Sequence, residues 1–273
     1  MLETMMNNVQ KTCPLIHNIT NYVTVNDCAN ILLAAGASPI MADEPLEAED
    51  ITSICSGLNI NMGTLNQRTV ESMILAGKKA NALNHPVLFD PVGAGASKYR
   101  LETAKRLLKE VDFDVIRGNV SEIKTLMEIS GTSRGVDASA EDKVTKENLD
   151  QAAAFAKQAS RALNAVIFMT GAIDIIADEN TVWCIYNGVP EMAAITGTGC
   201  QLSALTTAYI SANPDHKLEA CAAAAVLMGL AGEKAKERMS ELDGNSSMRS
   251  YIIDAVNCMT PLMLAKGAKY EIR

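Results

Sequence analysis

The chain has 273 residues and a formal net charge of −8, with 48% hydrophobic and 21% charged residues. This composition is typical of a globular protein and excludes a largely disordered one. The acidic charge also argues against a general nucleic-acid-binding protein. Aromatic residues make up only 4%, so we expect an aliphatic core rich in alanine and methionine. A chain of this length buries a large core without disulfide bonds, and we expect a single domain over residues 1–273.

The seven cysteines favour a reducing compartment. Their number is odd and no two have the Cys-x-x-Cys spacing, which disfavours a disulfide framework and a zinc site. The first residues lack the charged and apolar regions of a signal peptide. No apolar run reaches the length of a membrane span. We therefore expect a cytoplasmic protein that binds neither membrane nor nucleic acid.

Short apolar runs alternate with amphipathic stretches along the chain. In chain order, we predict a strand at 14–19, a helix at 22–35, strands at 38–41 and 57–62, a helix at 66–84, a strand at 86–89, a helix at 101–110, a strand at 115–116, helices at 121–129 and 146–163, a strand at 165–169, a hairpin of 173–177 and 181–186, and alanine-rich helices from 201 to the end. This alternation predicts an α/β three-layer sandwich, a mostly parallel sheet with helices on both faces. The late hairpin predicts an antiparallel edge, and the polar segment 132–146 is predicted to be a surface loop.

Polar residues and glycines follow the predicted strands. They are Asn18, Asn61, Gly63, Asp90, Arg117, Asn119, Thr170 and Gly171. In an open parallel sheet, ligands bind beyond the carboxyl ends of the strands. We therefore expect a binding site at this edge of the sheet.

The segment Gly197-Thr198-Gly199-Cys200 opens an alanine-rich helix. Glycines allow backbone N–H groups to converge, and a helix N-terminus adds positive partial charge, so this turn suits a phosphoryl group. An ordinary glycine turn before a helix is the alternative, and its position after the hairpin favours the phosphate site.

Residues Arg117 to Glu122 also carry two interpretations. Arg117 is suited to phosphate oxygens, while Asn119 and Glu122 offer oxygen ligands for hydrated Mg²⁺. The same residues are suited to a helix start, with Asn119 as N-cap and Glu122 completing a capping box. Both interpretations can hold together.

Three further residues are ambiguous by residue type alone. Asp90, before a proline, is either a metal-orienting carboxylate or a turn former. Thr170 is by type a β-branched strand residue before a glycine turn, and a phosphate contact is suggested for it only by the resemblance described below. Met41 is more simply a core residue, although its sulfur would also pack well on an aromatic heterocycle.

Five stretches together resemble the hydroxyethylthiazole kinase branch of the ribokinase-like superfamily. They are Pro14–Asn21 (PLIHNITN), Gly36–Met41 (GASPIM), Asp90–Gly95 (DPVGAG), Arg117–Glu122 (RGNVSE) and Gly197–Cys200 (GTGC). The superfamily carries Gly-x-Gly-Asp where this chain has Cys200, and this branch is known to carry either Cys or Asp there. The resemblance extends from about residue 14 to about residue 266 and is weakest over 132–146.

The resemblance implies a ribokinase-like fold and a Mg²⁺-dependent kinase that transfers phosphate from ATP to the hydroxyl of 4-methyl-5-(2-hydroxyethyl)thiazole in thiamine salvage. It implies a homotrimer with active sites shared between subunits. The implied roles are ATP binding for Arg117, Asn119, Thr170 and Gly199, thiazole binding for Asn21, Met41 and Gly197, metal binding for Asp90 and Glu122, and proton transfer for Cys200.

The role of Cys200 is open at this stage. A free thiol has a pKa of about 8.5, and a helix N-terminus lowers it, so Cys200 either accepts the substrate proton as a thiolate or only positions the alcohol. Three rival functions remain: a dehydratase that repairs hydrated nicotinamide cofactors, a hydroxymethylpyrimidine kinase, and a catalytically silent binding protein. Cys200 and the 14–21 stretch argue against the dehydratase. The co-occurrence of Asp90, Arg117, Glu122 and the glycine turn argues against the silent binder, although fold alone does not establish function.

Overall fold

The computed structural model describes residues 1–131 and 144–273, and most of the predicted 132–146 loop lies outside these ranges. The described residues form one nine-stranded sheet in the order β2-β1-β3-β4-β5-β6-β7-β8-β9. Its strands are β1 (Leu15–Ile19), β2 (Ser38–Met41), β3 (Gly57–Asn61), β4 (Val87–Asp90), β5 (Val115–Asn119), β6 (Val166–Thr170), β7 (Asp174–Ala177), β8 (Val182–Ile185) and β9 (Tyr270–Ile272). The pairings from β2 to β6 are parallel and those from β6 to β9 are antiparallel. The predicted parallel sheet with an antiparallel edge is confirmed.

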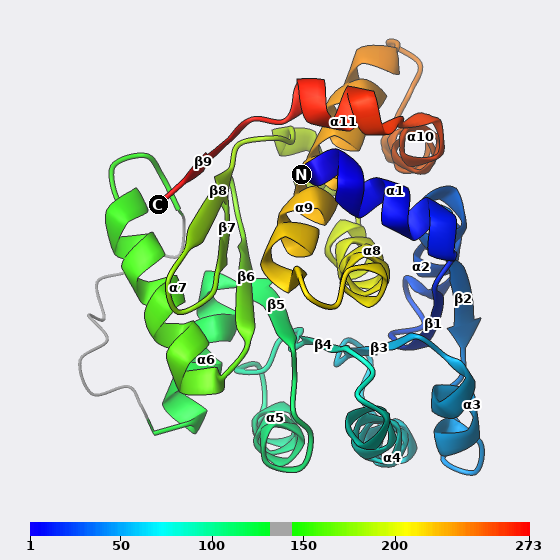
Figure 1. Ribbon diagram of the computed structural model, residues 1–273, viewed down its shortest axis with the longest axis vertical. Coiled ribbons are helices and arrows are strands. Elements are labelled where there is room, and N and C mark those ends of the chain that lie inside the picture. The colour runs from blue at the N-terminus through cyan, green and yellow to red at the C-terminus, as the bar shows by residue number, and fades with distance from the viewer. Residues whose placement is uncertain (132–143) are drawn as a thin grey trace.

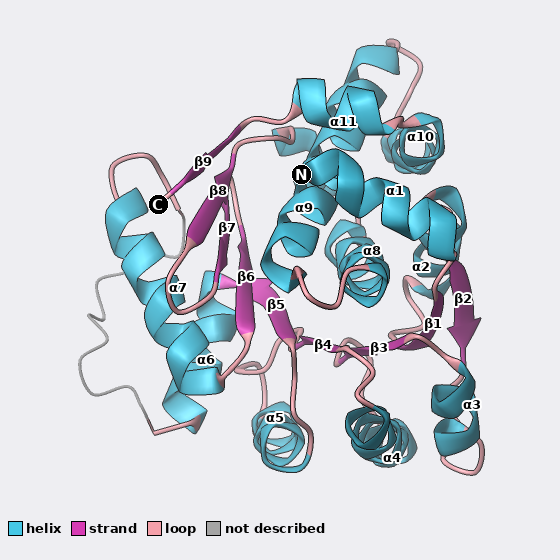
Figure 2. Ribbon diagram, viewed as in Figure 1, coloured by secondary structure: helices cyan, strands magenta, loops and turns pink. Residues whose placement is uncertain are grey.

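Helices cover both faces of the sheet, as Figures 1 and 2 show. One layer holds α1 (Leu2–Thr12), α2 (Val25–Ala34), α8 (Thr198–Ala212), α9 (Lys217–Arg238), α10 (Asn245–Cys258) and α11 (Pro261–Gly267). The other holds α3 (Ala48–Ile54), α4 (Gln67–Leu83), α5 (Lys98–Glu110), α6 (Val120–Ile129) and α7 (Leu149–Leu163). A short 3₁₀ helix, η1 (Pro190–Ala194), precedes α8. The three-layer architecture is thus the one that the alternating pattern predicts.

Each layer packs its own hydrophobic core against the sheet. Helices α8 and α9 are buried almost all round, over 201–210 and 220–232 respectively. Such helices must be apolar on every face, and alanine allows them to approach the sheet and each other closely. This explains how a chain with few aromatic residues fills its interior.

Besides η1, three elements were not predicted from the sequence, namely α1, α3 and β9. Helix α1 buries Leu2, Met5, Met6 and Val9, which recur at helical spacing within an otherwise polar segment. Strand β9 has three residues and exists because it pairs with β8, as Ile272 does with Trp183. A strand this short has no recognisable period of its own.

Two predicted boundaries were wrong in a way that concerns the site. Helix α2 begins at Val25 instead of residue 22, because the Asn21 carbonyl and side chain both accept the Thr24 backbone N–H and hold 21–24 as a turn. Strand β5 extends to Asn119, so Arg117 lies inside the strand and not after it.

Among the described residues, no helix combines the length and the apolar character needed to cross a bilayer.

Candidate active site

The carboxyl ends of β3 to β6 and the first turn of α8 meet at one edge of the sheet. Asp90 is the last residue of β4, Thr170 is the last residue of β6, and Arg117 lies on β5 between them. Helix α8 brings Gly199 and Cys200 to the same place from a distant part of the chain. The polar residues that follow the predicted strands therefore do gather at one edge of the sheet, and the binding site expected there stays a prediction.

Asp90 is fully buried and its two carboxylate oxygens differ sharply. Oδ2 accepts hydrogen bonds from Asn61 Nδ2 at 2.7 Å and Ser203 Oγ at 2.7 Å, and it lies 3.5 Å from Nη1 of Arg117. Oδ1 has no hydrogen-bond partner among the described residues. Burial raises the pKa of Asp90, and the neighbouring Arg117 charge opposes this. The carboxylate is therefore anchored through one oxygen, while the other is buried without a protein partner among the described residues.

Arg117 connects the three strands at this edge. Its Nη2 donates to Thr170 Oγ1 at 2.8 Å, while Nη1 faces Asp90. Gly199 packs directly on the guanidinium: a Cβ at this position would lie 2.7 Å from Nη1 and 2.8 Å from Nη2. Thr170 and Gly199, both predicted to bind ATP, thus each contact Arg117, which is predicted to do the same.

Asn119 and Glu122 form the predicted capping box at the start of α6. Asn119 Oδ1 accepts the Glu122 N–H at 2.8 Å, and Glu122 Oε2 accepts the Asn119 N–H at 2.8 Å. Glu122 Oε1 accepts the Gly93 N–H at 2.9 Å, which ties the loop after β4 to α6. The structural interpretation of this motif is confirmed. Glu122 also lies close enough to Asp90 for its charge to raise the Asp90 pKa.

Cys200 lies in the first turn of α8 and is mostly buried. Its Sγ accepts hydrogen bonds from Asn21 Nδ2 at 3.1 Å and from Asn61 Nδ2 at 3.4 Å. Burial and then the Asp90 charge raise the pKa of the thiol. The expectation that the helix end lowers this pKa was wrong, because removal from water and a nearby carboxylate both disfavour a thiolate.

Gly197 is the N-cap of α8 and has φ +91°, in the left-handed region that favours glycine. A Cβ at this position would lie 2.4 Å from Thr24 Cγ2, so the turn after β1 packs on the turn before α8. The first helical bond of α8 joins Gln201 N–H to Gly197 O. The preceding N–H groups of the first turn are free of intrahelical partners, as at any helix start.

Met41, by contrast, lies apart from Arg117 and Asp90. It ends the edge strand β2, is half-buried and pairs in register with Asn18 of β1. Asn21 follows β1, the strand next to β2, and its side chain contacts Cys200. It therefore lies between Met41 on one side and Cys200 and Arg117 on the other. The site residues therefore form a line along the sheet edge, from Met41 through Asn21 and Cys200 to Arg117.

A cavity of about 670 Å³ opens beside Arg117. Its polar end contains Arg117, Thr170, Asp174 and Gly199, and its apolar end is lined by residues of the 187–193 segment and of α8 and α9. No sequence motif pointed to this apolar end, whose side chains are ordinary core residues by type.

The comparisons with known proteins agree with this geometry. The model of the hydroxyethylthiazole kinase family matches residues 6–261. The hydroxyethylthiazole kinase of Clostridium acetobutylicum is 60% identical over 271 residues, 99% of each chain. The chain belongs to the hydroxyethylthiazole kinase family. A second relative of that name, from Clostridium beijerinckii, is 49% identical over 98% of this chain and 95% of its own.

Solved structures place this member of the hydroxyethylthiazole kinase family among ribokinase-like folds. A hydroxyethylthiazole kinase protein from Pyrococcus horikoshii superimposes with a TM-score of 0.88 at 33% identity, covering 100% of this chain and 98% of that one. An ADP complex of Bacillus subtilis pyridoxal kinase, at 17% identity and a TM-score of 0.56 over 84% of this chain and 94% of that one, shares the fold alone.

Three residues at the candidate site were not among the predicted site residues. Asn61 is one of the polar residues that follow the predicted strands, but the sequence analysis assigned no function to it. Asp174 was part of the predicted hairpin, and Ser203 lies inside an apolar helix. The signal for Ser203 is its spacing, since a residue three positions after Cys200 lies on the same side of the helix.

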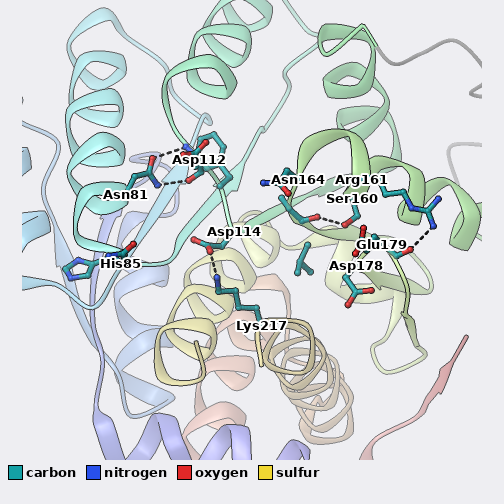
Figure 3. Close-up of a pocket in the computed structure, with 14 residues that line it drawn as sticks. Asn81, His85, Asp112, Asp114, Ser160, Arg161, Asn164, Asp178, Glu179 and Lys217 are labelled. Atoms are coloured by element: carbon teal, nitrogen blue, oxygen red, sulfur yellow. Dashed lines mark hydrogen bonds and ion pairs between the residues drawn. The ribbon is translucent and has the colours of Figure 1, made fainter. Parts of the chain in front are cut away.

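A second cavity, of about 640 Å³, lies at the opposite end of the strands (Figure 3). It is lined by residues that precede β4, β5 and β6, including His85, Asp114 and Asn164, and Lys217 reaches Asp114 from the start of α9 (Figure 3). None of the predicted site residues lines it.

Asp174 provides a pH test of the cavity's polar end. Removal from water raises its pKa from 3.8 to about 6, partly offset by the Gly171 N–H bond and the Arg117 charge. A raised folded-state pKa contributes stability below pH 4 that is lost as the pH rises through 6. We expect Asp174→Asn, which keeps the acceptor for Gly171, to be more stable than the unmodified chain at pH 7.5 by up to about 3 kcal/mol. Thermal denaturation at pH 4 and pH 7.5 should show this gain only at the higher pH, and an equal gain at both would contradict the assignment.

Proposed function

We propose that the chain transfers the γ-phosphoryl group of ATP to the hydroxyl of 4-methyl-5-(2-hydroxyethyl)thiazole, releasing ADP and the thiazole monophosphate for thiamine synthesis. The observation that carries the proposal is that Arg117 contacts Asp90, Thr170 and Gly199 beside a cavity, in a member of this family. Phosphoryl transfer depends mainly on alignment and on charge stabilisation, which this cluster is built to supply.

Arg117 and Thr170 bind the ATP phosphates in this proposal, with Gly199 allowing the close approach. Asn119, exposed at the end of β5, contributes a polar group at the rim. The free N–H groups of residues 198–200 hold the transferring phosphoryl group at the N-terminus of α8. The apolar end of the cavity, between residues 187–193 and α9, accommodates the adenine ring.

Asp90 has the character of a Mg²⁺ site, because a buried carboxylate oxygen without a partner among the described residues suits a hydrated cation. Glu122 adds charge nearby, although both of its oxygens already accept backbone N–H groups. When bound, Mg²⁺ neutralises phosphate charge. Asp90 and Glu122 would hold it, and Asn61 and Ser203 keep Asp90 oriented.

The substrate hydroxyl forms the new P–O bond while the bond from the γ-phosphorus to the bridging oxygen of ATP breaks. The hydroxyl proton leaves late in this loose transition state and passes to an oxygen of the transferred phosphoryl group. A strong base is therefore not needed. Because burial and Asp90 keep Cys200 protonated at neutral pH, we assign Cys200 to positioning the alcohol beside the phosphoryl group.

Replacing Cys200 with aspartate should preserve or raise turnover. An aspartate at this helix start can accept the proton directly, and Asn21 Nδ2 and Asn61 Nδ2 already point at the position to hydrogen-bond it. The measurement is kcat for Cys200→Asp against Cys200→Ala, with ATP and thiazole binding determined separately. A Cys200→Asp variant that binds both substrates normally but does not turn over contradicts the placement of Cys200 at the reacting hydroxyl.

The thiazole alcohol occupies the part of the edge marked by Met41, Asn21 and Gly197, with Met41 packing on the ring. Around the edge strand β2 and its neighbours lie exposed apolar side chains, namely Tyr22, Val23, Leu33, Leu46 and Ile54. Exposed apolar side chains on the elements around the edge strand of a sheet support burial of this edge against another subunit. We therefore propose a homotrimer in which neighbouring subunits complete each thiazole pocket.

The seven cysteines, all within the described ranges, are free thiols, and Cys13 and Cys258 are exposed. Exposed free thiols support a reducing environment, and we place the enzyme in the cytoplasm.

The test of the function is ADP release from Mg-ATP in the presence of the thiazole alcohol, with the hydroxymethylpyrimidine alcohol as control. Thiazole-dependent ADP release, with no stimulation by the pyrimidine, is the expected result. Stimulation by the pyrimidine alone would assign the chain to the other alcohol. No stimulation by either, from folded protein that binds ATP, would reject the kinase function.

A further inference from the structure

We infer that Asn61 is a positioning residue for phosphoryl transfer, which holds Asp90 and Cys200 in a fixed relation through the two hydrogens of one amide group. The inference rests on the proposed function, because it assigns a task within that reaction. Asn61 is the last residue of β3 and is buried with 2% of its surface exposed.

Every hydrogen-bonding group of the Asn61 side chain is in use. Nδ2 donates to Asp90 Oδ2 at 2.7 Å and to Cys200 Sγ at 3.4 Å. Oδ1 accepts from Gly63 N at 2.9 Å and from Asn21 Nδ2 at 3.0 Å. The side chain thus joins the ends of β1, β3 and β4 to the first turn of α8.

The direction of this amide is determined by the backbone. The Gly63 N–H is an obligatory donor, so it must face the oxygen of Asn61, and Nδ2 is then turned toward Asp90 and Cys200. A rotated amide would place its oxygen against the Asp90 carboxylate and lose four hydrogen bonds. Asn21 is oriented in the same way, because its Oδ1 accepts the Thr24 backbone N–H at 3.2 Å.

The orientation of the Asn61 amide affects the hydrogen bonding of Asp90 and Cys200. Asn61 and Ser203 both donate to Oδ2 of Asp90, whereas Oδ1 is buried and has no hydrogen-bond partner among the described residues. The sulfur of Cys200 accepts from both Asn61 and Asn21, so both of its lone pairs are engaged and its own hydrogen is directed away from these amides. One amide therefore sets the orientation of the two groups that flank the phosphoryl acceptor.

The test replaces Asn61 with aspartate, which has nearly the same shape. The acceptor for Gly63 and Asn21 survives, while the two donors become an oxygen that faces Asp90 Oδ2 in a dry site. We expect kcat to fall about 100-fold, the size associated with misplaced reacting groups, while the Kd for a non-hydrolysable ATP analogue changes by less than about threefold.

Asn59 provides a matched control on the same strand. Two residues before Asn61, it lies on the same face of β3, is fully buried, and donates through Nδ2 to Asn18 Oδ1 at 3.0 Å and not to a carboxylate. We expect Asn59→Asp to lose thermal stability but to keep the kcat of its folded fraction. An Asn61→Asp variant with near-normal kcat, or equal losses of kcat in both variants, would overturn the inference. If the aspartate variants do not fold, Asn61→Ser and Asn59→Ser make the same comparison without an added charge.

A second measurement separates this inference from the proposed function. Combining Asn61→Asp with Asp90→Asn reverses the donor and the acceptor, so the double variant should regain part of the melting temperature lost by Asn61→Asp alone. The pair Asn59→Asp and Asp90→Asn should show no such recovery. Failure of the unmodified chain to phosphorylate either alcohol would reject the proposed function, whereas absence of the recovery would reject the role of Asn61 whatever the substrate.

Discussion

Arg117→Ala is expected to lower kcat about a thousandfold, the size commonly found when an arginine that stabilises a transferring phosphoryl group is removed. The side chain is 11% exposed and contacts Asp90, Thr170 and the backbone of α8 at Gly199. Its loss removes a charge that offsets the phosphates and also leaves Asp90 without its nearest positive neighbour. Steady-state ADP release, together with ATP-analogue binding by calorimetry, measures the effect.

Two further variants serve as controls for Arg117→Ala. Arg117→Lys keeps the charge but places it on a single nitrogen, in place of the two guanidinium nitrogens that separately face Thr170 and Asp90, and we expect it to recover only part of the lost turnover. Arg106→Ala removes an exposed arginine of α5 whose partner is Glu110, and it should leave kcat unchanged. Near-normal turnover of Arg117→Ala, or full recovery by lysine, would show that the proposed phosphate contact is wrong.

Gly199→Ala is expected to damage the ATP site without damaging the fold. The added methyl would lie 2.7 Å from Nη1 of Arg117, a separation that real Cβ atoms do not adopt, so the guanidinium must move. A displacement of this kind commonly costs about 100-fold in kcat/KM. Stability should hold, because alanine favours the first turn of α8 by up to about 1 kcal/mol relative to glycine.

The control for Gly199→Ala is Gly244→Ala, since a Cβ at Gly244 meets no atom of the described residues within 4 Å. Its turnover and its affinity for the ATP analogue should match those of the unmodified chain. An ATP affinity of Gly199→Ala equal to that of Gly244→Ala would mean that the guanidinium reaches the phosphates from another position.

The alternation of strands and helices was predictable because each element is encoded locally. Apolar residues at helical spacing indicate a buried helix face, and short unbroken apolar runs indicate a buried strand. Both patterns can be recognised within a segment of about ten residues, and such a segment also contains the polar residues at the end of the strand. Asp90, Arg117 and Thr170 were found by this reasoning, since all parallel strands present their carboxyl ends at one edge. The capping box of Asn119 and Glu122 was equally local and was correctly predicted.

The short elements were not predictable for the complementary reason. Strand β9 has no period of its own and is defined by its pairing with β8. The turn at 21–24 replaced a predicted first helical turn because the Asn21 side chain competes for the Thr24 N–H, as asparagine commonly does at turns.

By itself, the sequence determined the fold class, the edge of the sheet at which the candidate site residues gather, and most of the residues at the polar end of the cavity beside it. The tertiary structure alone decided how those residues interact. Asn21 and Cys200 are 179 positions apart, Asn61 and Cys200 139, and Asp90 and Ser203 113, so no local pattern connects them. The pKa of Cys200 also depends on the tertiary structure. The sequence shows that Cys200 begins a helix, which by itself would lower the pKa of its thiol. Burial and the neighbouring Asp90 carboxylate raise that pKa and outweigh the helix end, and both arise only when the chain is folded.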